Sequence, residues 1–133
     1  MSHPYDTGYA LPFPSFPLKI RQVEGSRTTD TVPALVDTGA DGTLVPADLL
    51  ASIGAEEIYS TRIRSHWGEW RPVNIYLVDL EIEGASFSAI EVIADTTMGD
   101  TVLLGRNVLN KLILLLDGPH QQTDVLFQRP RRF

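Results

Sequence analysis

Cysteine is absent from this 133-residue chain, which excludes disulfide bonds, thiolate zinc sites, iron–sulfur clusters and cysteine nucleophiles. Histidine is scarce as well, since His3, His66 and His120 are the only three, and their spacing matches no histidine-built metal site. The missing cysteines fit a reducing compartment. We therefore expect no metal site.

Long apolar runs are also absent. The longest, residues 112–116, is far shorter than the roughly 20 residues that a membrane-spanning helix needs. The N-terminal residues 1–6 are polar, so we expect no signal peptide. Eleven Lys and Arg against seventeen Asp and Glu give a net charge of −6, which offers nucleic acid and anionic membranes no general attraction. The sequence thus favours a soluble, cytoplasmic protein with neither of these partners.

The chain has the length of one domain and 43% apolar residues, and three parts can be distinguished. Residues 1–17 contain four of the nine prolines and are predicted to form an extended arm outside the core, because proline cannot donate to a β-ladder. Residues 18–128 form the predicted domain. Residues 129–133 form a short basic tail.

The domain is predicted to be mostly β, because short apolar runs alternate with turn residues at roughly ten-residue spacing. The predicted strands cover 18–23, 32–36, 58–63, 73–82, 87–94, 113–116 and 125–127. Two short helices are expected over 46–53 and 106–112. This arrangement favours a small β-barrel.

The apolar phase of residues 73–82 slips near Val78 and Asp79, which predicts a β-bulge there. A turn at 83–85 is expected to connect this strand to the next one. In that next strand we expect five buried side chains, namely Phe87, Ala89, Ile90, Val92 and Ala94.

Asp37 is the main candidate for a functional residue. The apolar strand at 32–36 delivers its carboxylate into a Thr-Gly turn, at a buried strand end. Burying a carboxylate costs free energy, so an acid at this position suggests that it has a function. The tripeptide Asp-Thr-Gly occurs once more, at Asp6, but no apolar strand precedes that copy. We therefore interpret the second copy as a solvated turn.

Two segments of the chain have distinctive patterns. The first is Ala34-Leu35-Val36-Asp37-Thr38-Gly39-Ala40-Asp41-Gly42-Thr43-Leu44-Val45. The second is Val102-Leu103-Leu104-Gly105-Arg106-Asn107-Val108-Leu109. They resemble two motifs of the retropepsins, the aspartic proteases of retroviral type. Their order and separation are similar to those of the family, and the resemblance covers about residues 18–128. It implies a mostly β fold, a small closed barrel with one short C-terminal helix, active as a homodimer.

The resemblance also implies roles for the residues around Asp37. Asp37 itself corresponds to the single catalytic aspartate of each subunit. Thr38 corresponds to the residue whose hydroxyl bonds across the dimer, and Gly39 to the one that provides a tight backbone turn near the scissile peptide. Ala40 and Asp41 are implied to line the substrate cleft.

Arg106 corresponds to the helix arginine that, in the family, pairs with the acidic residue found here as Asp41. We interpret its role as architectural support of the active-site loop. The alternative for Asp41 and Arg106 is an ion pair with no connection to function.

The flap, a β-hairpin that covers the cleft in this family, would have its tip at residues 65–70. This tip contains one glycine, Gly68, and so departs from the glycine-rich tips of many relatives. Trp67, with Gly68, is predicted to contact a substrate, and Trp70 is a second candidate. The alternative is that one tryptophan packs beneath the hairpin. We interpret His66 as a solvated flap residue.

The resemblance implies an aspartic endopeptidase that acts on a peptide or protein substrate. Hydrolysis needs a base and an acid, and a chain with one usable aspartate must take the second carboxylate from a twin. No metal or cofactor is then needed. The alternative is a non-proteolytic module that keeps the fold for dimerisation and binding. Cleavage of its own Phe16–Pro17 bond is a further possibility, against an arm that stays intact.

Overall fold

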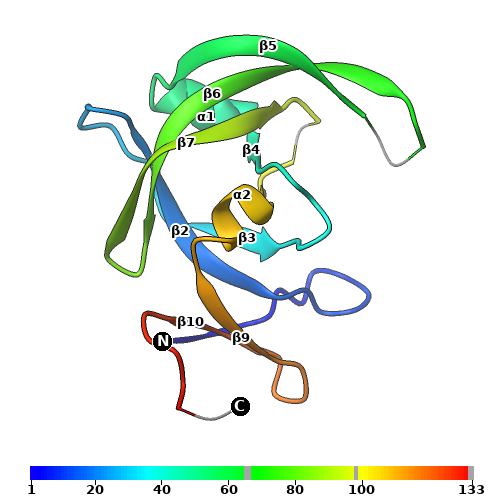
Figure 1. The fold of residues 1–133 in the computed structure, drawn as a ribbon, viewed down its shortest axis with the longest axis vertical. Helices are drawn as coiled ribbons and strands as arrows, with labels where there is room; N and C mark the ends of the chain where they lie inside the picture. Colours follow the sequence, from blue (N-terminus) through cyan, green and yellow to red (C-terminus); the bar gives the residue numbers. More distant parts are fainter. Residues whose placement is uncertain (65–66, 98, 132–133) are drawn as a thin grey trace.

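The computed structural model describes residues 1–64, 67–97 and 99–131, and most of its regular structure is β (Figure 1). Six of the described strands form a barrel, which closes because β2 pairs with both β3 and β6. These strands are β2 (Ser15–Gln22), β3 (Val32–Val36), β4 (Leu44–Pro46), β6 (Trp70–Ile82), β7 (Ala85–Asp95) and β8 (Val102–Leu104). The long strand β5 (Glu56–Arg64) pairs with β6 and extends the sheet beyond the barrel. The predicted closed β-barrel is confirmed.

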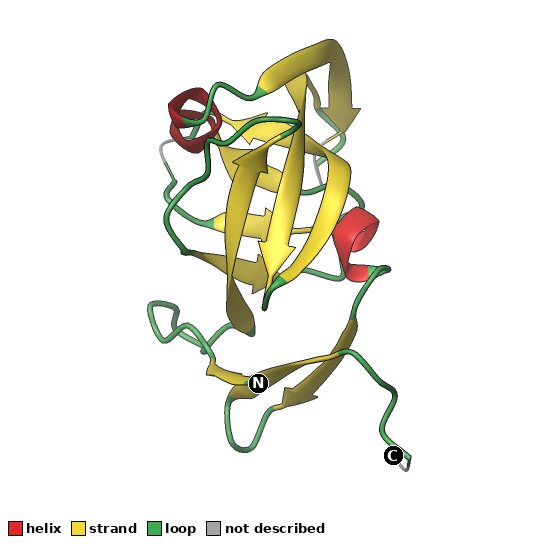
Figure 2. Ribbon diagram, turned by 90° about the vertical axis from the view of Figure 1, so that its left-hand side faces the viewer, coloured by secondary structure: helices red, strands yellow, loops and turns green. Residues whose placement is uncertain are grey.

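A second, three-stranded sheet lies below the barrel (Figure 2). It consists, in spatial order, of β1 (Ser2–Pro4), β10 (Gln122–Leu126) and β9 (Ile113–Asp117). Because β1 pairs with β10, part of the predicted N-terminal arm belongs to a sheet. This pairing places a segment near the N-terminus beside a segment near the C-terminus.

Two short helices interrupt the strands. The first, α1 (Ala47–Ser52), follows β4 directly, and the chain leaves it at Gly54, whose φ of 62° suits glycine. The second, α2 (Arg106–Leu109), follows β8 and is three residues shorter than the range predicted for it. In the part of the chain that the structure describes, no helix is long and apolar enough to cross a membrane.

The barrel interior is filled by alternate residues of its strands. In β2, Phe16, Leu18 and Ile20 are at most 2% exposed, while the residues between them are half-buried. Leu80 of β6, the register partner of Ile20, and Val92 of β7 belong to the same core, each at most 1% exposed. Successive side chains of a strand point to opposite faces, which is why the apolar alternation identifies the core.

The bulge predicted near Val78 and Asp79 is present. Two residues of β7, Ser88 and Ala89, lie opposite the single residue Asp79 of β6. The prediction that Ala89 is buried was wrong, because at the bulge its φ is 55° and its amide turns to donate to the Asp79 carboxylate at 2.8 Å. Ala89 is therefore exposed, whereas Ile90 is buried as expected.

The first barrel strand begins at Ser15, three residues earlier than predicted. Pro17 lies opposite Pro33 of β3, so the two prolines share one position of the ladder. Phe16 is in the core and is 2% exposed. A protease could reach the Phe16–Pro17 bond only after this strand had left the barrel, which argues against self-cleavage there.

Phe16 offers a test of this packing. We expect Phe16→Ala to lower the free energy of unfolding by about 3–5 kcal/mol, because the substitution leaves a cavity in the core. Phe127→Ala is the matched control, since Phe127 is 59% exposed and should cost about 0.5 kcal/mol or less. Urea unfolding of both variants measures the difference, and equal midpoints would contradict the assignment of Phe16 to the core.

Candidate active site

Asp37 lies at the carboxyl end of β3, where this strand runs parallel to β8. Val36 is the register partner of Leu104, and the Asp37 amide donates to the Leu104 carbonyl at 3.0 Å. On the other side of the strand, the Val36 amide donates to the Pro14 carbonyl at 2.9 Å. The chain therefore reaches Asp37 from a strand that is held along both edges.

The Asp37 side chain stabilises the turn that follows it. Its Oδ1 accepts a hydrogen bond from the Gly39 amide at 3.0 Å, and its carbonyl accepts one from the Ala40 amide at 3.3 Å. Asp37 is half-buried in the single chain, whereas Val36 before it is 7% exposed. Thr38 and Gly39 are exposed. Across the described residues, no group of three or more His, Asp or Glu side chains is placed to hold a metal ion.

The second Asp-Thr-Gly copy forms the same local hydrogen bond. The Gly8 amide donates to Asp6 Oδ1 at 2.8 Å, and Thr7 and Gly8 are exposed, in agreement with a turn. Asp6 exchanges backbone hydrogen bonds with Phe13 instead of joining a barrel strand. The tripeptide therefore determines only the turn, and the attachment to β8 distinguishes Asp37.

Arg106 supports the Asp37 loop from the start of α2. Its Nη1 donates to the Thr38 carbonyl at 2.8 Å, and its amide donates to the Ala40 carbonyl at 2.8 Å. The ion pair that resemblance implied with Asp41 is not formed among the described residues, because the guanidinium is directed at the backbone instead. The Asp41 carbonyl is bound by the Asn107 amide at 3.2 Å.

The buried Thr43 and the exposed Asn107 form a connection that sequence reasoning missed. The Thr43 hydroxyl donates a hydrogen bond to Asn107 Oδ1 at 2.7 Å and accepts one from the Gly105 amide at 3.1 Å. Asn107 Nδ2 donates in turn to the Glu91 carbonyl of β7 at 2.9 Å. Thr43 is fully buried, so these partners replace the water that its hydroxyl would otherwise bind. The sequence feature that could have predicted this connection is the polar residue in each motif, Thr43 in the first and Asn107 in the second.

Gly105 allows the Asp37 loop to lie close to the start of α2. A Cβ atom on Gly105 would stand 2.1 Å from the Gly42 carbonyl oxygen and 2.5 Å from its carbonyl carbon. Both obstacles are backbone atoms, which cannot rotate away. The close approach is what allows the Arg106 and Asn107 amides to reach the loop carbonyls.

A cavity of about 420 Å³ lies between the barrel and the hairpin made by β5 and β6, which we call the flap hairpin. Its lining comes from β4, from the flap hairpin and from the end of β7 with the loop after it. The residues are Leu44, Ile63, Arg71, Pro72, Val73, Asn74, Ile93, Ala94, Asp95, Thr96 and Thr97. Apolar side chains thus form much of the lining, with polar groups beside them.

The predicted substrate contacts lie outside this lining. Ala40 is half-buried and Asp41 exposed on the loop after Asp37. Trp67 is 87% exposed in the turn of the flap hairpin, and Gly68 beside it has a φ of 84°. These four assignments stay predictions. Trp70 is 59% exposed, and His66 falls outside the described residues.

Gly105 provides a test of the loop's attachment. We expect Gly105→Ala to destabilise the protein by about 3 kcal/mol, because the added methyl overlaps the backbone of Gly42. Gly118→Ala is the control, since a Cβ there meets nothing within 4 Å. Thermal unfolding compares the two variants, and a Gly105→Ala protein as stable as the control would disprove the contact.

Solved structures of aspartic proteases are similar to this chain. A crystal structure of a retropepsin-like aspartic protease from Rickettsia conorii superposes with a TM-score of 0.63 at 15% identity, covering 94% of this chain and 88% of that one. The EIAV protease complexed with the inhibitor HBY-793 gives a TM-score of 0.51 at 18% identity, covering 80% and 91%. At these identities the likeness shows the fold. No curated protein sequence matches the chain significantly.

A family sequence model matches the part of the chain that contains the candidate active site. The sequence model of the family described as "gag-polyprotein putative aspartyl protease" matches residues 23–111, about two thirds of the chain. That stretch includes the Asp37 loop, the flap hairpin and the Arg106 segment that supports the loop. The chain therefore belongs to the gag-polyprotein aspartyl protease family, and its fold is that of the retropepsin-like aspartic proteases.

Proposed function

We propose that the protein is an aspartic endopeptidase that hydrolyses peptide bonds as a homodimer, with one Asp37 from each subunit. The observation that carries the proposal is the half-buried carboxylate of Asp37, held at a strand end by β8 and by the Gly39 amide. Two such carboxylates close together share one proton, since like charges resist double ionisation. One then activates water and the other protonates the departing nitrogen, the division best known from aspartic proteases.

The chain offers an edge at which a second subunit can dock. Strand β9 is an edge of the three-stranded sheet, and its other side is covered by β10. Leu115 and Leu116 in this strand are 44% and 45% exposed, which is unusual for a short apolar run. Two β9 strands related by a two-fold axis can pair antiparallel, which joins the two free sheet edges and places the apolar segments of the two subunits beside one another. We assign the subunit interface to this edge.

The remaining site residues receive roles within the proposal. Thr38, Gly39 and Arg106 hold the loop, and the Arg106 bond to the Thr38 carbonyl supports this role. Ala40 and Asp41, with Trp67 and Gly68 of the flap hairpin, contact the peptide. The cavity beneath the flap hairpin accepts a side chain of the substrate. We propose residues 18–128, together with residues 15–17 that begin β2, as the catalytic unit between an arm and a tail. We also propose the cytoplasm as its location, because the chain has no cysteine.

The two Asp-Thr-Gly copies give a matched pair of variants. In a peptide-library digestion, we expect Asp37→Asn to lower the cleavage rate by about 10³-fold or more, because it removes the acid–base pair. Asp6→Asn, which changes the same motif outside the barrel, should keep full activity. Loss of activity in both variants, or in neither, would refute the assignment of Asp37.

The pH profile tests the shared proton. Activity should be bell-shaped with an optimum below neutrality, because the pair must hold one proton between two carboxylates. Chelators should leave the rate unchanged. A rate that keeps rising above pH 8 would exclude this mechanism. If dimers form and no peptide of the library is cleaved, the protein is a binding module instead.

Subunit mixing tests the origin of the second carboxylate. When wild type is mixed with an equal amount of Asp37→Asn and the subunits exchange fully, about half of the original activity should remain, because mixed dimers carry one carboxylate. A self-contained active site would keep all of it. Unchanged activity after proven exchange would therefore overturn the dimeric mechanism.

A further inference from the structure

The outer edge of β5 is long and open. This nine-residue strand is the last in the order of the seven-stranded sheet, and among the described residues it pairs with β6 only. Eight of its nine residues are exposed, so the flap hairpin projects from the barrel (Figure 1). In a strand with one partner, alternate residues direct their backbone N–H and C=O groups away from that partner. The edge can therefore accept a further strand.

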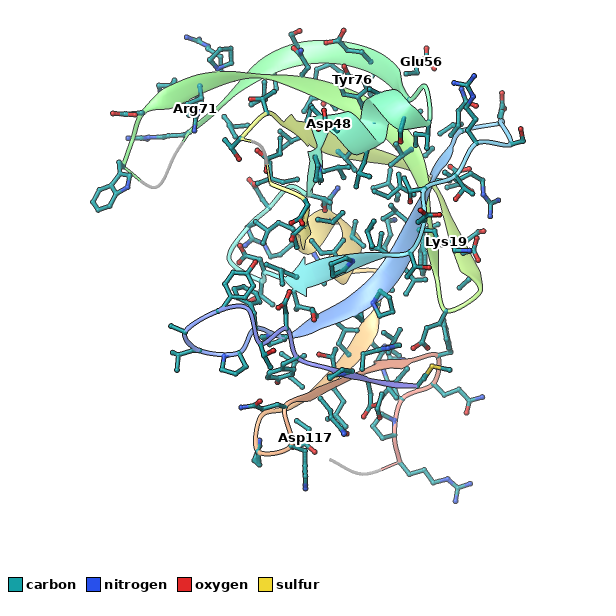
Figure 3. The ribbon with its side chains drawn as sticks, turned by 180° about the vertical axis from the view of Figure 1, so that it is seen from behind. Lys19, Asp48, Glu56, Arg71, Tyr76 and Asp117 are labelled. Carbon is teal, nitrogen blue, oxygen red and sulfur yellow. The ribbon has the colours of Figure 1, made fainter. Side chains whose placement is uncertain are left out.

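One face of the flap hairpin gathers cationic and aromatic side chains. Arg64 lies directly opposite Trp70 in the register, and Arg62 is two residues further along the same strand. Residues directly opposite one another point to the same face, as do residues two apart, so these three share a face. Arg71, which is labelled in Figure 3, lies opposite Ile63 at the next position of the ladder. Both residues line the cavity. Arg62, Arg64 and Trp70 therefore occupy the outer face.

Trp70 orients Arg62, and no carboxylate among the described residues neutralises either of the two outer arginines. The Arg62 guanidinium lies over the Trp70 ring at 5.7 Å from its centre, a cation–π contact that orients it. Among the described residues, neither Arg62 nor Arg64 forms a salt bridge with a carboxylate, whereas Arg21 pairs with Glu81. This is a local positive site on a chain whose net charge is −6.

We propose that Arg62, Arg64 and Trp70, together with the open edge of β5, form a docking site for an extended acidic peptide. The peptide adds to β5 as a strand and places carboxylates against the two arginines. Arg62 and Arg64 are two positions apart, so their side chains are separated by roughly 7 Å along the strand. Acidic residues at alternate positions of the peptide have the same separation and point to the same face. The site therefore selects acids at positions i and i+2.

The occupant is a peptide and not another polyanion. The net charge of −6 repels nucleic acid and anionic membranes as a whole, so only a ligand that engages the site locally gains from its arginines. Backbone groups at a sheet edge recognise a polypeptide by β-augmentation. Resting on the proposed function, we assign this peptide to a segment of the protein substrate away from the bond that is cleaved.

The binding experiment uses the full-length Asp37→Asn protein, so that the peptide is not cut. A ten-residue peptide with glutamates at two alternate positions is titrated by calorimetry and by tryptophan emission. The chain's two tryptophans, Trp67 and Trp70, are both in the flap hairpin, so their emission reports on this site. We expect saturable binding with a change in emission. A peptide of the same composition with adjacent glutamates should bind more weakly.

The variants are matched in charge. Arg62→Ser with Arg64→Ser should weaken binding by about tenfold, since two exposed charge pairs are lost. Arg129→Ser with Arg131→Ser removes the same charge from exposed arginines of the tail and should leave binding unchanged. Arg62→Glu with Arg64→Glu should instead bind a peptide with lysines at the alternate positions. This gain of binding also shows that the altered hairpin is folded.

Several results would overturn the proposal. The first two are a tail variant whose binding is weakened as much as that of the Arg62→Ser and Arg64→Ser protein, and a peptide with adjacent glutamates that binds as tightly as the one with alternate glutamates. The other two are peptide binding without a change in tryptophan emission, and tighter binding to vesicles of anionic lipid than to the peptide. The proposed protease function is judged separately. If the Asp37→Asn protein binds the peptide but wild type cleaves no substrate, that function alone fails. If wild type is active and the acidic segment leaves KM unchanged, the docking site alone fails.

Discussion

The close contact between the Asp37 loop and the start of α2 is the constraint on which the candidate active site depends. Gly105 allows two backbone segments to touch, because a Cβ atom at this position would overlap the backbone of Gly42. The hydrogen bonds of the buried Thr43 hydroxyl replace the water that the contact excludes. Neither segment could hold an aspartate in place alone. A short loop after a strand is ordinarily mobile, and this one is fastened by backbone amides from another part of the chain.

This attachment leaves the Asp37 side chain half-exposed on a single chain, which is informative about assembly. The exposed leucines of β9 lie in the other sheet, at a separate edge of the molecule. In the homodimer that we propose, the Asp37 carboxylates of the two subunits meet, and β9 is the edge that we assign to the subunit interface.

The flap hairpin differs from the barrel in how its residues are used. Its inner face, with Ile63 and Val73, contributes to the cavity, whereas its outer face carries Arg62 stacked on Trp70. The strand pattern requires such a division, because successive side chains alternate between faces. One hairpin can therefore serve two ligand segments without moving the residues that shape the cavity.

The sequence by itself determined the class of fold, the order of the longer strands and the position of Asp37, because apolar alternation and the two motifs are local properties. The strands β1, β4 and β8 were missed, since three residues contain too little periodicity to be recognised. Only the tertiary structure decided that Arg106 binds the Thr38 carbonyl instead of Asp41, that Ala89 turns outward at the bulge, and that Thr43 is buried. Each of these depends on a partner distant in the sequence, whose position follows from how the barrel closes.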